Sequence, residues 1–284
     1  MDDTNVKIAP APWKCTANVY AVYFYSSPKS KNATDIPIVA YSPLEKESSF
    51  TSPEAGHFAG GVGSFMIVQY SDTPVGPYDE LVIIPGAYTY RVQDKSGKWM
   101  EKKNPRATRT YVSQKHTCFN GRNNWNIPKH LARFEWKDLP NGAKQVKVFP
   151  FDTSTDQAEV SASSTPIFQA SFNTIPYLPA FPMSTKWFEN LGVNTALVQP
   201  PLPQGEPKEV AGTEQWCECP MSQYSSKTHI GWFDLRQRDD AGALTGLFEN
   251  FWPGMKRWQL GLRMDDADLE IPEGEYWRAP EANP

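Results

Sequence analysis

The sequence has no long apolar run and no excess of basic charge. Its longest apolar stretches, such as Val19–Tyr25 and Leu81–Pro85, are far shorter than the roughly 20 residues that a membrane-spanning helix needs. The 28 lysines and arginines are balanced by 32 acidic residues, whereas nucleic-acid-binding proteins usually carry a basic excess. Met1–Trp13 contains neither the basic nor the apolar region of a signal peptide. We therefore expect no membrane partner, no nucleic-acid partner and a cytoplasmic location.

The sequence also lacks the short motifs that bind metals and cofactors. It contains no P-loop, no dinucleotide-binding fingerprint, no HExxH zinc motif and no GxSxG nucleophile elbow. Its histidines do not pair at metal-ligand spacing, and no second cysteine or histidine pair accompanies Cys217 and Cys219 at zinc-finger spacing. We expect no metal, no cofactor and buried free thiols.

Helical periodicity is scarce, whereas proline and aromatic residues are abundant. Proline makes up 26 of the 284 residues and aromatic residues 13% of the chain. Proline interrupts helices, and aromatic side chains favour strands. Short β-branched or aromatic runs recur between turn residues, at Asn18–Tyr25, Ser64–Tyr70, Glu80–Ile84, Ala87–Val92, Lys144–Pro150 and Pro166–Phe172. Together these features predict a mainly β fold with few short helices.

We expect two short helices and a single domain. Pro128 at a first helical position favours a turn of helix over Ile127–Arg133, and a capping serine favours a helix over Ser184–Leu191. Polar loops separate groups of strand signals, at Ser26–Glu54, Asp152–Thr165 and Pro200–Gly212. Strand signals of the same character continue on both sides of each loop, which predicts one domain over residues 1–284.

One polar segment, Gly121–Phe134, contains a candidate nucleophile. On the surface, Lys129 would be an ordinary solvated lysine. In an apolar pocket beside His130 or Arg122, desolvation and a neighbouring cation would lower its pKa and leave a free amine. Such an amine attacks ketones and forms a Schiff base. The apolar walls would come from Trp125, Ile127 and Phe134. The spacing of these residues leaves both interpretations open.

Two segments resemble the acetoacetate decarboxylase family. GRNNWNIPKHLARF, residues 121–134, is similar to the active-site segment of that family, in which a Gly-Arg pair and then Pro-Lys precede a short helix. YSDTPVGPYDEL, residues 70–81, resembles a strand–turn–strand whose glutamate faces the Schiff-base lysine. Both occur in the family's order and at about its separation. The resemblance covers residues 13–136 and is closest to acetoacetate-decarboxylase-like proteins common in fungi.

This resemblance implies a fold and a set of site residues. The fold would consist of antiparallel sheets that close around a central apolar cavity. Lys129 takes the place of the Schiff-base lysine and Glu80 that of the acid/base glutamate. Without the resemblance, Glu80 would be an ordinary solvated charge at the end of a strand. We expect the substrate to be bound by Arg122, His130, Phe65, Tyr78 and Trp125.

The sequence departs from the family pattern at three positions. His130 stands where the decarboxylase has a second lysine, Phe65 aligns with a second glutamate, and Asn18 aligns with an arginine that binds the substrate carboxylate. We therefore expect a larger and more apolar carbonyl substrate, such as an aromatic or polyketide-like compound. The reaction would be decarboxylation of a β-keto acid, or related aldol or dehydration chemistry. The alternative is a non-catalytic barrel that binds a small hydrophobic ligand, and a homo-oligomer is compatible with either function.

Overall fold

The computed structural model describes residues 5–28, 36–94, 96–153, 156, 158–190 and 194–278. Strands dominate it: β1 (Trp13–Ser26), β2 (His57–Asp72), β3 (Tyr78–Ile84), β4 (Ala87–Gln93), β5 (Trp99–Pro105), β6 (Arg109–Val112), β7 (Lys129–Asp138), β8 (Lys144–Pro150), β9 (Phe168–Thr174), β10 (Phe181–Ser184), β11 (Leu197–Gln199), β12 (Trp216–Cys219), β13 (Ser222–Asp234), β14 (Trp258–Ile271) and β15 (Glu275–Trp277). The α-helices are short: α1 (Pro43–Lys46), α2 (Lys115–Trp125) and α3 (Lys186–Asn190). The prediction of a mainly β fold with few short helices is confirmed.

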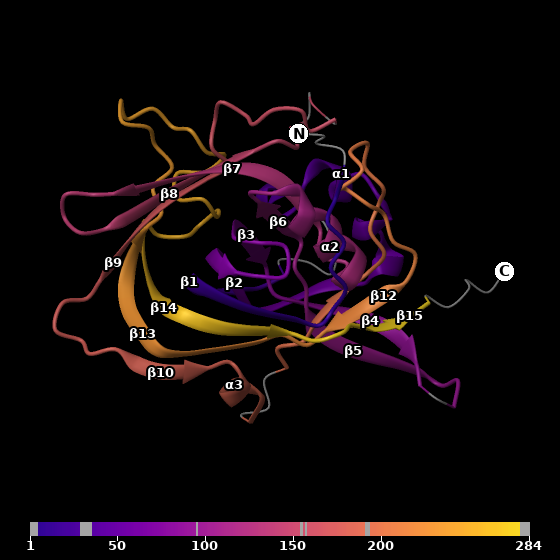
Figure 1. Cartoon of the computed structure of the whole chain (residues 1–284). Coiled ribbons are helices and arrows are strands. Elements are labelled where there is room, and N and C mark those ends of the chain that lie inside the picture. The colour runs from indigo at the N-terminus through magenta and orange to yellow at the C-terminus, as the bar shows by residue number, and fades with distance from the viewer. Residues whose placement is uncertain are drawn as a thin grey trace.

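Nine strands form a closed barrel (Figure 1). Their order is β1-β14-β13-β9-β8-β7-β6-β3-β2, and β2 pairs back with β1 to close the ring. Among the described strands of this ring, β6 and β7 are the parallel pair and the other neighbours are antiparallel. A parallel pair needs a crossover connection, and here α2 supplies it. This crossover places the start of β7 beside α2.

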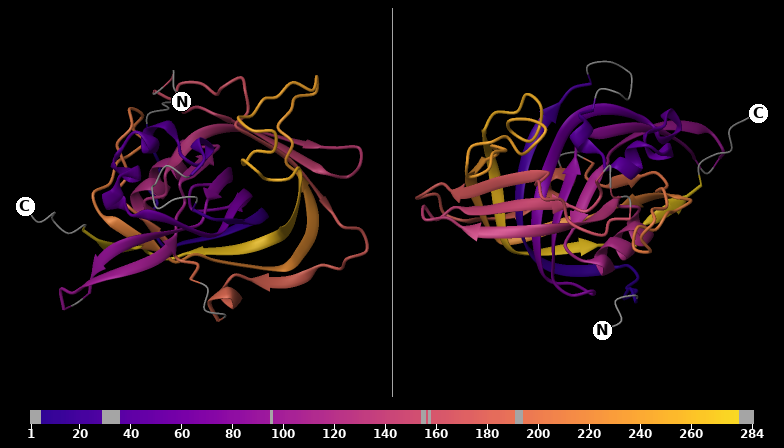
Figure 2. Two further views of the ribbon diagram at one scale, coloured as in Figure 1. Left: turned by 180° about the vertical axis from the view of Figure 1, so that it is seen from behind. Right: turned by 90° about the horizontal axis from the view of Figure 1, so that it is seen from above.

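Additional strands extend the barrel and cover one part of it. β4 pairs with β2 and β5 pairs with β4, so that these two strands form a hairpin that projects from the barrel, as Figure 2 shows from behind. β11, β12 and β15 form a separate three-stranded sheet.

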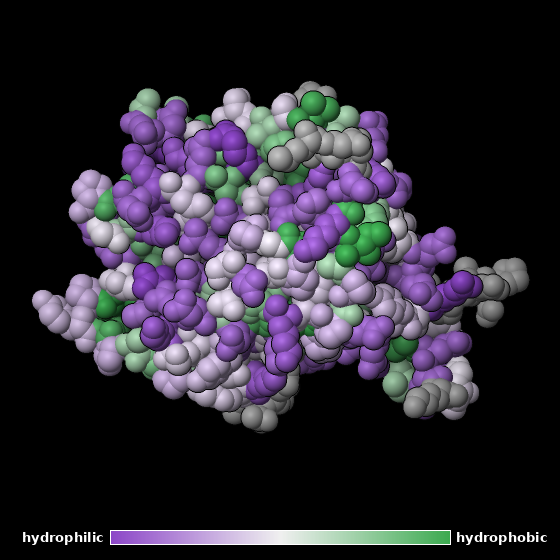
Figure 3. Space-filling model, viewed as in Figure 1, coloured by the Kyte–Doolittle hydropathy of each residue, from purple (hydrophilic) through white to green (hydrophobic). Residues whose placement is uncertain are grey.

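The face of the molecule in Figure 3 is largely hydrophilic, with small scattered apolar patches. Among the described residues, no helix has the length and apolarity required to cross a membrane.

The two faces of the barrel wall pack in two different hydrophobic cores, as the side chains of β2 show. Phe65 and Ile67 belong to a core that draws on β1, β2, β3, β6, β7, β8, β9 and β13. Met66 and Val68 point to the opposite face and belong to a second core, which includes residues of β1, β3, β14, α2, β11 and β12. Because successive side chains of a strand alternate between faces, the first core fills the barrel and the second lies between the wall and its covering elements.

The predicted helix over Ile127–Arg133 is wrong. The helix of this region is α2, which ends at Trp125 and is capped by Asn126 in a left-handed conformation with φ 53°. Lys129 already begins β7, which pairs with β6 and β8. The alternating apolar residues Ala132, Phe134 and Trp136 suit a strand between two neighbours, and this pairing outweighs the preference of Pro128 for a helix start.

The other local predictions had mixed outcomes. α3 lies within the predicted helix Ser184–Leu191, of which Leu191 is outside the described residues. The predicted loop Ser26–Glu54 contains α1 and short 3₁₀ turns in its described part. α1 brings the buried carboxyl group of Glu45 into the protein interior.

Candidate functional site

An apolar cavity of about 750 Å³ lies against the outer face of the β1–β3 part of the wall. Its lining includes Trp13, Met66, Val68, Tyr70, Tyr78, Glu80, Val82, Trp125, Ile127, Lys129, Met183, Phe188, Met221 and Leu262. These residues come from the barrel wall, from α2 and from the covering strands and α3. This volume is within the range of sites that bind small molecules.

Lys129 and Glu80 meet in this cavity. The Nζ atom of Lys129 lies 2.7 Å from Oε2 of Glu80. Lys129 pairs with Thr110 on β6, and Thr110 pairs with Val82 on β3. Glu80 is two residues from Val82 and therefore shares its face of the sheet. The register thus brings both side chains into the cavity from strands that are not direct neighbours.

Two further groups surround the amine of Lys129. Its Nζ atom donates a hydrogen bond to Oγ1 of Thr117 at 3.0 Å. It also lies 5.3 Å from the centre of the Tyr78 ring, which stacks on Tyr70 with ring centres 4.3 Å apart. Lys129 is 5% exposed and Glu80 7% exposed. The ammonium group therefore faces a carboxylate, a hydroxyl group and an aromatic ring with little access to water.

The expected lowering of the Lys129 pKa is wrong. Burial by itself lowers this pKa, but the charge of Glu80 and the neighbouring Tyr78 raise it by more, so the net direction is upward. The expectation of a lowered pKa depended on a cation, His130 or Arg122, beside the amine of Lys129. In the structure, the group closest to the ammonium is the Glu80 carboxylate instead. The resting site therefore contains an ammonium–carboxylate ion pair.

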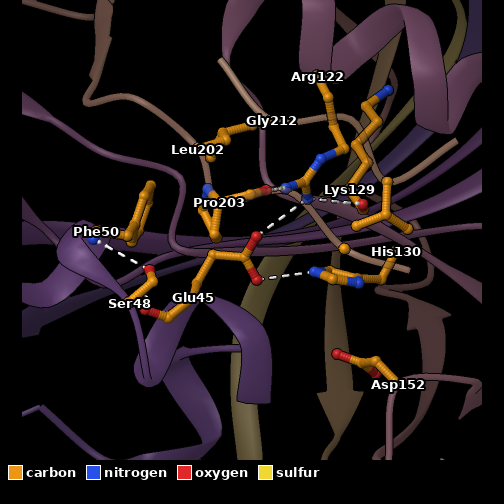
Figure 4. A network of polar contacts seen from close by, with 12 residues as sticks. Glu45, Ser48, Phe50, Arg122, Lys129, His130, Asp152, Leu202, Pro203 and Gly212 are labelled. Atoms are coloured by element: carbon orange, nitrogen blue, oxygen red, sulfur yellow. Dashed lines mark hydrogen bonds and ion pairs between the residues drawn. The ribbon is translucent and has the colours of Figure 1, made fainter. Parts of the chain in front are cut away.

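His130 and Arg122 belong to a different network on the other side of Lys129 (Figure 4). In this network, the Glu45 carboxylate lies between the two cations, 2.7 Å from Nε2 of His130 and 3.0 Å from Nη1 of Arg122. Nδ1 of His130 lies 2.6 Å from Oε1 of Glu159. These side chains are buried. Successive residues of a strand point to opposite faces, so His130 is turned away from the cavity that contains the amine of Lys129.

Mutual charge stabilisation keeps this network ionised at neutral pH. For Glu45, burial opposes ionisation, but His130 and Arg122 lower its pKa to about 2. For His130, burial opposes protonation, but Glu45 and Glu159 raise its pKa to about 10. Buried charges are tolerated only where they are paired and hydrogen-bonded, and this condition is met here.

Arg122 fixes backbone segments and does not line the cavity. Its guanidinium donates to the carbonyl oxygens of Lys129, Pro203 and Ala211 at 3.2, 2.7 and 2.8 Å. These bonds join α2, the start of β7 and the loop that precedes β12. Neither Arg122 nor His130 lines the cavity. Both are paired with buried partners and support the backbone that carries Lys129, and their expected contact with a substrate stays a prediction.

Phe65 also lies outside the cavity, contrary to expectation. It is fully buried in the barrel core, where its ring contacts Phe24, Phe168 and Phe251. The cavity-facing positions of β2 beside it are Ser64 and Met66. Phe65 therefore points away from the amine of Lys129, into the barrel core.

Of the other residues that the sequence predicted for the site, Tyr78 and Trp125 lie in the cavity wall and Asn18 does not. The contact of Tyr78 and Trp125 with a substrate stays a prediction. Asn18 lies at an irregularity of the β1–β14 pairing, where its side-chain oxygen accepts a hydrogen bond from the backbone of Asp266. Asn18 is not among the residues that line the cavity.

Two residues of the site were missed by sequence reasoning. Thr117, which contacts the amine of Lys129, lies in a segment without a strong helical pattern. Glu45 lies in a segment that was predicted to be a loop. An acidic residue directly after Pro43-Leu44 gives no local signal that it will be buried. Among the described residues, no group of three or more acidic, cysteine or histidine side chains is placed to hold a metal ion.

Comparison with solved structures identifies the fold of this chain. No family model matches the chain, and no curated protein matches its sequence. A crystal structure of acetoacetate decarboxylase from Legionella pneumophila superposes with a TM-score of 0.55 at 12% identity, covering 96% of this chain and 90% of that one. A second acetoacetate decarboxylase structure superposes with a TM-score of 0.54 at 14% identity, covering 96% and 92%. The chain has the acetoacetate decarboxylase fold.

This similarity covers nearly the whole chain, beyond the residues 13–136 that carried the sequence resemblance. The acetoacetate decarboxylase fold therefore extends over the second half, where β13 and β14 complete the barrel. At 12–14% identity the similarity supports the fold alone, and the chemistry has to be argued from the cavity. A particular kinship to fungal proteins stays a prediction.

Proposed function

We propose that this protein is a Schiff-base-forming lyase that acts on a carbonyl substrate, with Lys129 as the nucleophile and Glu80 as the proton acceptor and donor. The observation that supports it best is the 2.7 Å contact between these two side chains, both buried at an apolar cavity of about 750 Å³. A buried amine beside a single carboxylate has an acceptor for its proton at hydrogen-bonding distance. The acetoacetate decarboxylase fold is consistent with this chemistry.

The first step is transfer of one proton from the Lys129 ammonium to Glu80. An apolar substrate that displaces water from the cavity favours this transfer, because the neutral pair has a lower desolvation cost than the ion pair. The free amine then adds to the substrate carbonyl. Protonated Glu80 gives its proton to the hydroxyl group of the resulting carbinolamine, this group leaves as water, and an iminium ion remains attached to Lys129.

The iminium ion serves as the electron acceptor for bond cleavage. In a β-keto acid, the bond to the carboxylate breaks, carbon dioxide leaves and its bonding electrons form an enamine. A water molecule supplies a second proton, which Glu80 passes to the enamine carbon, and water then hydrolyses the resulting iminium to release product and the Lys129 ammonium. The same intermediate supports aldol cleavage or dehydration. This protein's residues therefore supply one nucleophile and one proton carrier.

The cavity favours a larger apolar carbonyl compound, such as an aromatic or polyketide-like ketone. Aliphatic, methionine and aromatic side chains together line most of it, and Lys103 is a further charged residue in its lining. An apolar wall disfavours an unpaired carboxylate by several kcal/mol. A small keto acid would therefore depend on the two lysines for its negative charge, whereas a bulky apolar group would gain contacts with the walls.

A non-catalytic ligand-binding barrel is the second candidate. The raised pKa of Lys129 favours it, because an ammonium group held by a carboxylate does not attack a carbonyl. Such a protein would bind hydrophobic molecules in the same cavity without a covalent step.

Borohydride trapping separates the two functions. Borohydride reduces an iminium ion to a stable amine, so that a panel of ketones and keto acids should label the peptide that contains Lys129. Lys103→Ala is the matched control for the neutral ketones of the panel, because it removes a cavity lysine that has no assigned covalent role and provides no charge partner for these compounds. Labelling that persists in Lys103→Ala and disappears in Lys129→Ala supports the lyase. Tight binding of apolar carbonyl compounds without any label supports the binding barrel.

A further inference from the structure

We propose that one face of α2, formed by Thr117 and Gly121, is a seat that positions the side chain of Lys129 toward Glu80. This inference builds on the proposed function, and it assigns two positioning residues to the reaction. Residues four apart lie on the same face of a helix, and here both contact the same lysine. Thr117 contacts its amine, and Gly121 adjoins its stem.

Gly121 is explained by the space that Lys129 occupies. A Cβ atom built on Gly121 would lie 2.5 Å from Cδ, 2.6 Å from Cε and 3.1 Å from Nζ of Lys129. Carbon atoms do not approach so closely without displacement. The backbone of Gly121 does not have a positive φ, and glycine weakens the interior of a helix relative to alanine. Close passage of the Lys129 side chain is therefore the structural reason for a glycine here.

Thr117 fixes the end of the same side chain. It is fully buried, and its Oγ1 atom accepts a hydrogen bond of 3.0 Å from Nζ of Lys129. Its side chain is also hydrogen-bonded to Tyr78, whose ring flanks the amine. With the stem against Gly121 and the amine on Thr117, Nζ is directed to Glu80 at 2.7 Å. Precise placement of reacting groups is worth a large part of the rate in such reactions.

A stability cycle, which compares the melting temperature of Gly121→Ala in the wild-type and Lys129→Ala backgrounds, tests the seat without an activity measurement. We expect Gly121→Ala to lower the melting temperature, because the new methyl group displaces the lysine or the helix. In the Lys129→Ala background the same change should leave the melting temperature unchanged or raise it, because the three closest atoms are then absent. Asn123→Ala on the exposed side of α2 reports the gain in helix propensity together with the loss of one exposed hydrogen bond, from Asn123 to the carbonyl oxygen of Phe119. An equal loss of melting temperature in both backgrounds would overturn the seat.

The pH profile of borohydride trapping tests the positioning of the amine. Thr117→Val keeps the shape of the side chain but removes the acceptor of the ammonium hydrogen bond, so the trapping midpoint should move to lower pH. Thr117→Ser should restore the wild-type midpoint. Gly121→Ala should reduce the trapping rate at least tenfold while the overall fold, followed by circular dichroism, is kept.

The two proposals fail in different ways. Trapping in the wild type with unchanged rates and midpoints in Thr117→Val and Gly121→Ala would overturn the seat and leave the lyase standing. Absence of trapping in the wild type would overturn the lyase, and the stability cycle would still decide whether α2 seats the lysine.

Discussion

Lys129 and Glu80 form a buried ion pair across a strand that neither belongs to. β6 lies between β3 and β7 in the barrel, yet Nζ of Lys129 and Oε2 of Glu80 are 2.7 Å apart. The shared face of the sheet, and not sequence proximity, creates the pair. Its burial means that removing either partner leaves the other charge without compensation.

Lys129→Ala should abolish trapping and also destabilise the protein at neutral pH. The remaining Glu80 carboxylate is buried and unpaired, which costs about 3 kcal/mol of unfolding free energy. The double variant Lys129→Ala/Glu80→Gln should recover most of this loss, because it removes the charge. Urea unfolding of both variants at pH 7 measures the difference. If the single variant is as stable as the double variant, Glu80 is not an isolated charge in the absence of Lys129.

Glu80→Gln should lower the pKa of Lys129. Glu80 is the main group that raises this pKa against the effect of burial. Without its charge, burial prevails and the amine loses its proton at lower pH. The midpoint of the pH dependence of borohydride trapping should therefore shift downward, while turnover is lost because the proton acceptor is gone. A midpoint that stays or rises would show that Glu80 does not control the charge of Lys129.

Glu45→Gln should destabilise the protein more than the loss of an exposed carboxylate. Glu45 compensates two buried cations, Arg122 and His130, and its neutralisation should cost about 3–5 kcal/mol. The control is Glu270→Gln, which breaks the contact of Glu270 with Lys186. Their side chains are 50% and 60% exposed, and such a pair contributes at most about 1 kcal/mol. Comparable losses in urea unfolding of the two variants would contradict a special role for the Glu45 network.

His130 should make the protein less stable as the pH rises above neutrality. Its folded-state pKa is raised to about 10, above the ordinary value of about 6.5. The stabilisation is complete below the ordinary pKa and is lost progressively as pH rises through the folded value. The unfolding free energy of the wild type should therefore fall from pH 6.5 to 9.5 more steeply than that of His130→Gln. Parallel pH profiles would show that His130 is not charged in the folded protein.

Much of the fold and part of the site could be predicted from the sequence. Alternating and aromatic runs such as Ser64–Tyr70 locate strands because burial of one face imposes a period of two. The pairing of Lys129 with Glu80 was accessible through the family resemblance. A single domain over residues 1–284 stays a prediction.

The remaining features depend on contacts between distant segments. Glu45 is 77 residues from Arg122 and 85 from His130 in the sequence, so no local pattern reports their contact. For the same reason the cation expected beside Lys129 was misplaced: adjacency of His130 in the sequence puts it on the opposite face of the strand. Whether Phe65 faces the cavity or the core likewise depends on strand register.

The cavity should discriminate substrates by size and polarity. Its apolar lining predicts that a bulky aromatic β-keto acid or ketone is trapped on Lys129 at least tenfold more efficiently than acetoacetate, because contacts with methionine and aromatic walls add to binding. Met183 lines the cavity from β10, and Met183→Trp should reduce its free volume. This variant should weaken trapping of the bulky compound and spare that of acetoacetate, which provides the internal control. Equal trapping of both compounds in the wild type, with an equal loss in Met183→Trp, would show that the cavity walls do not select the substrate.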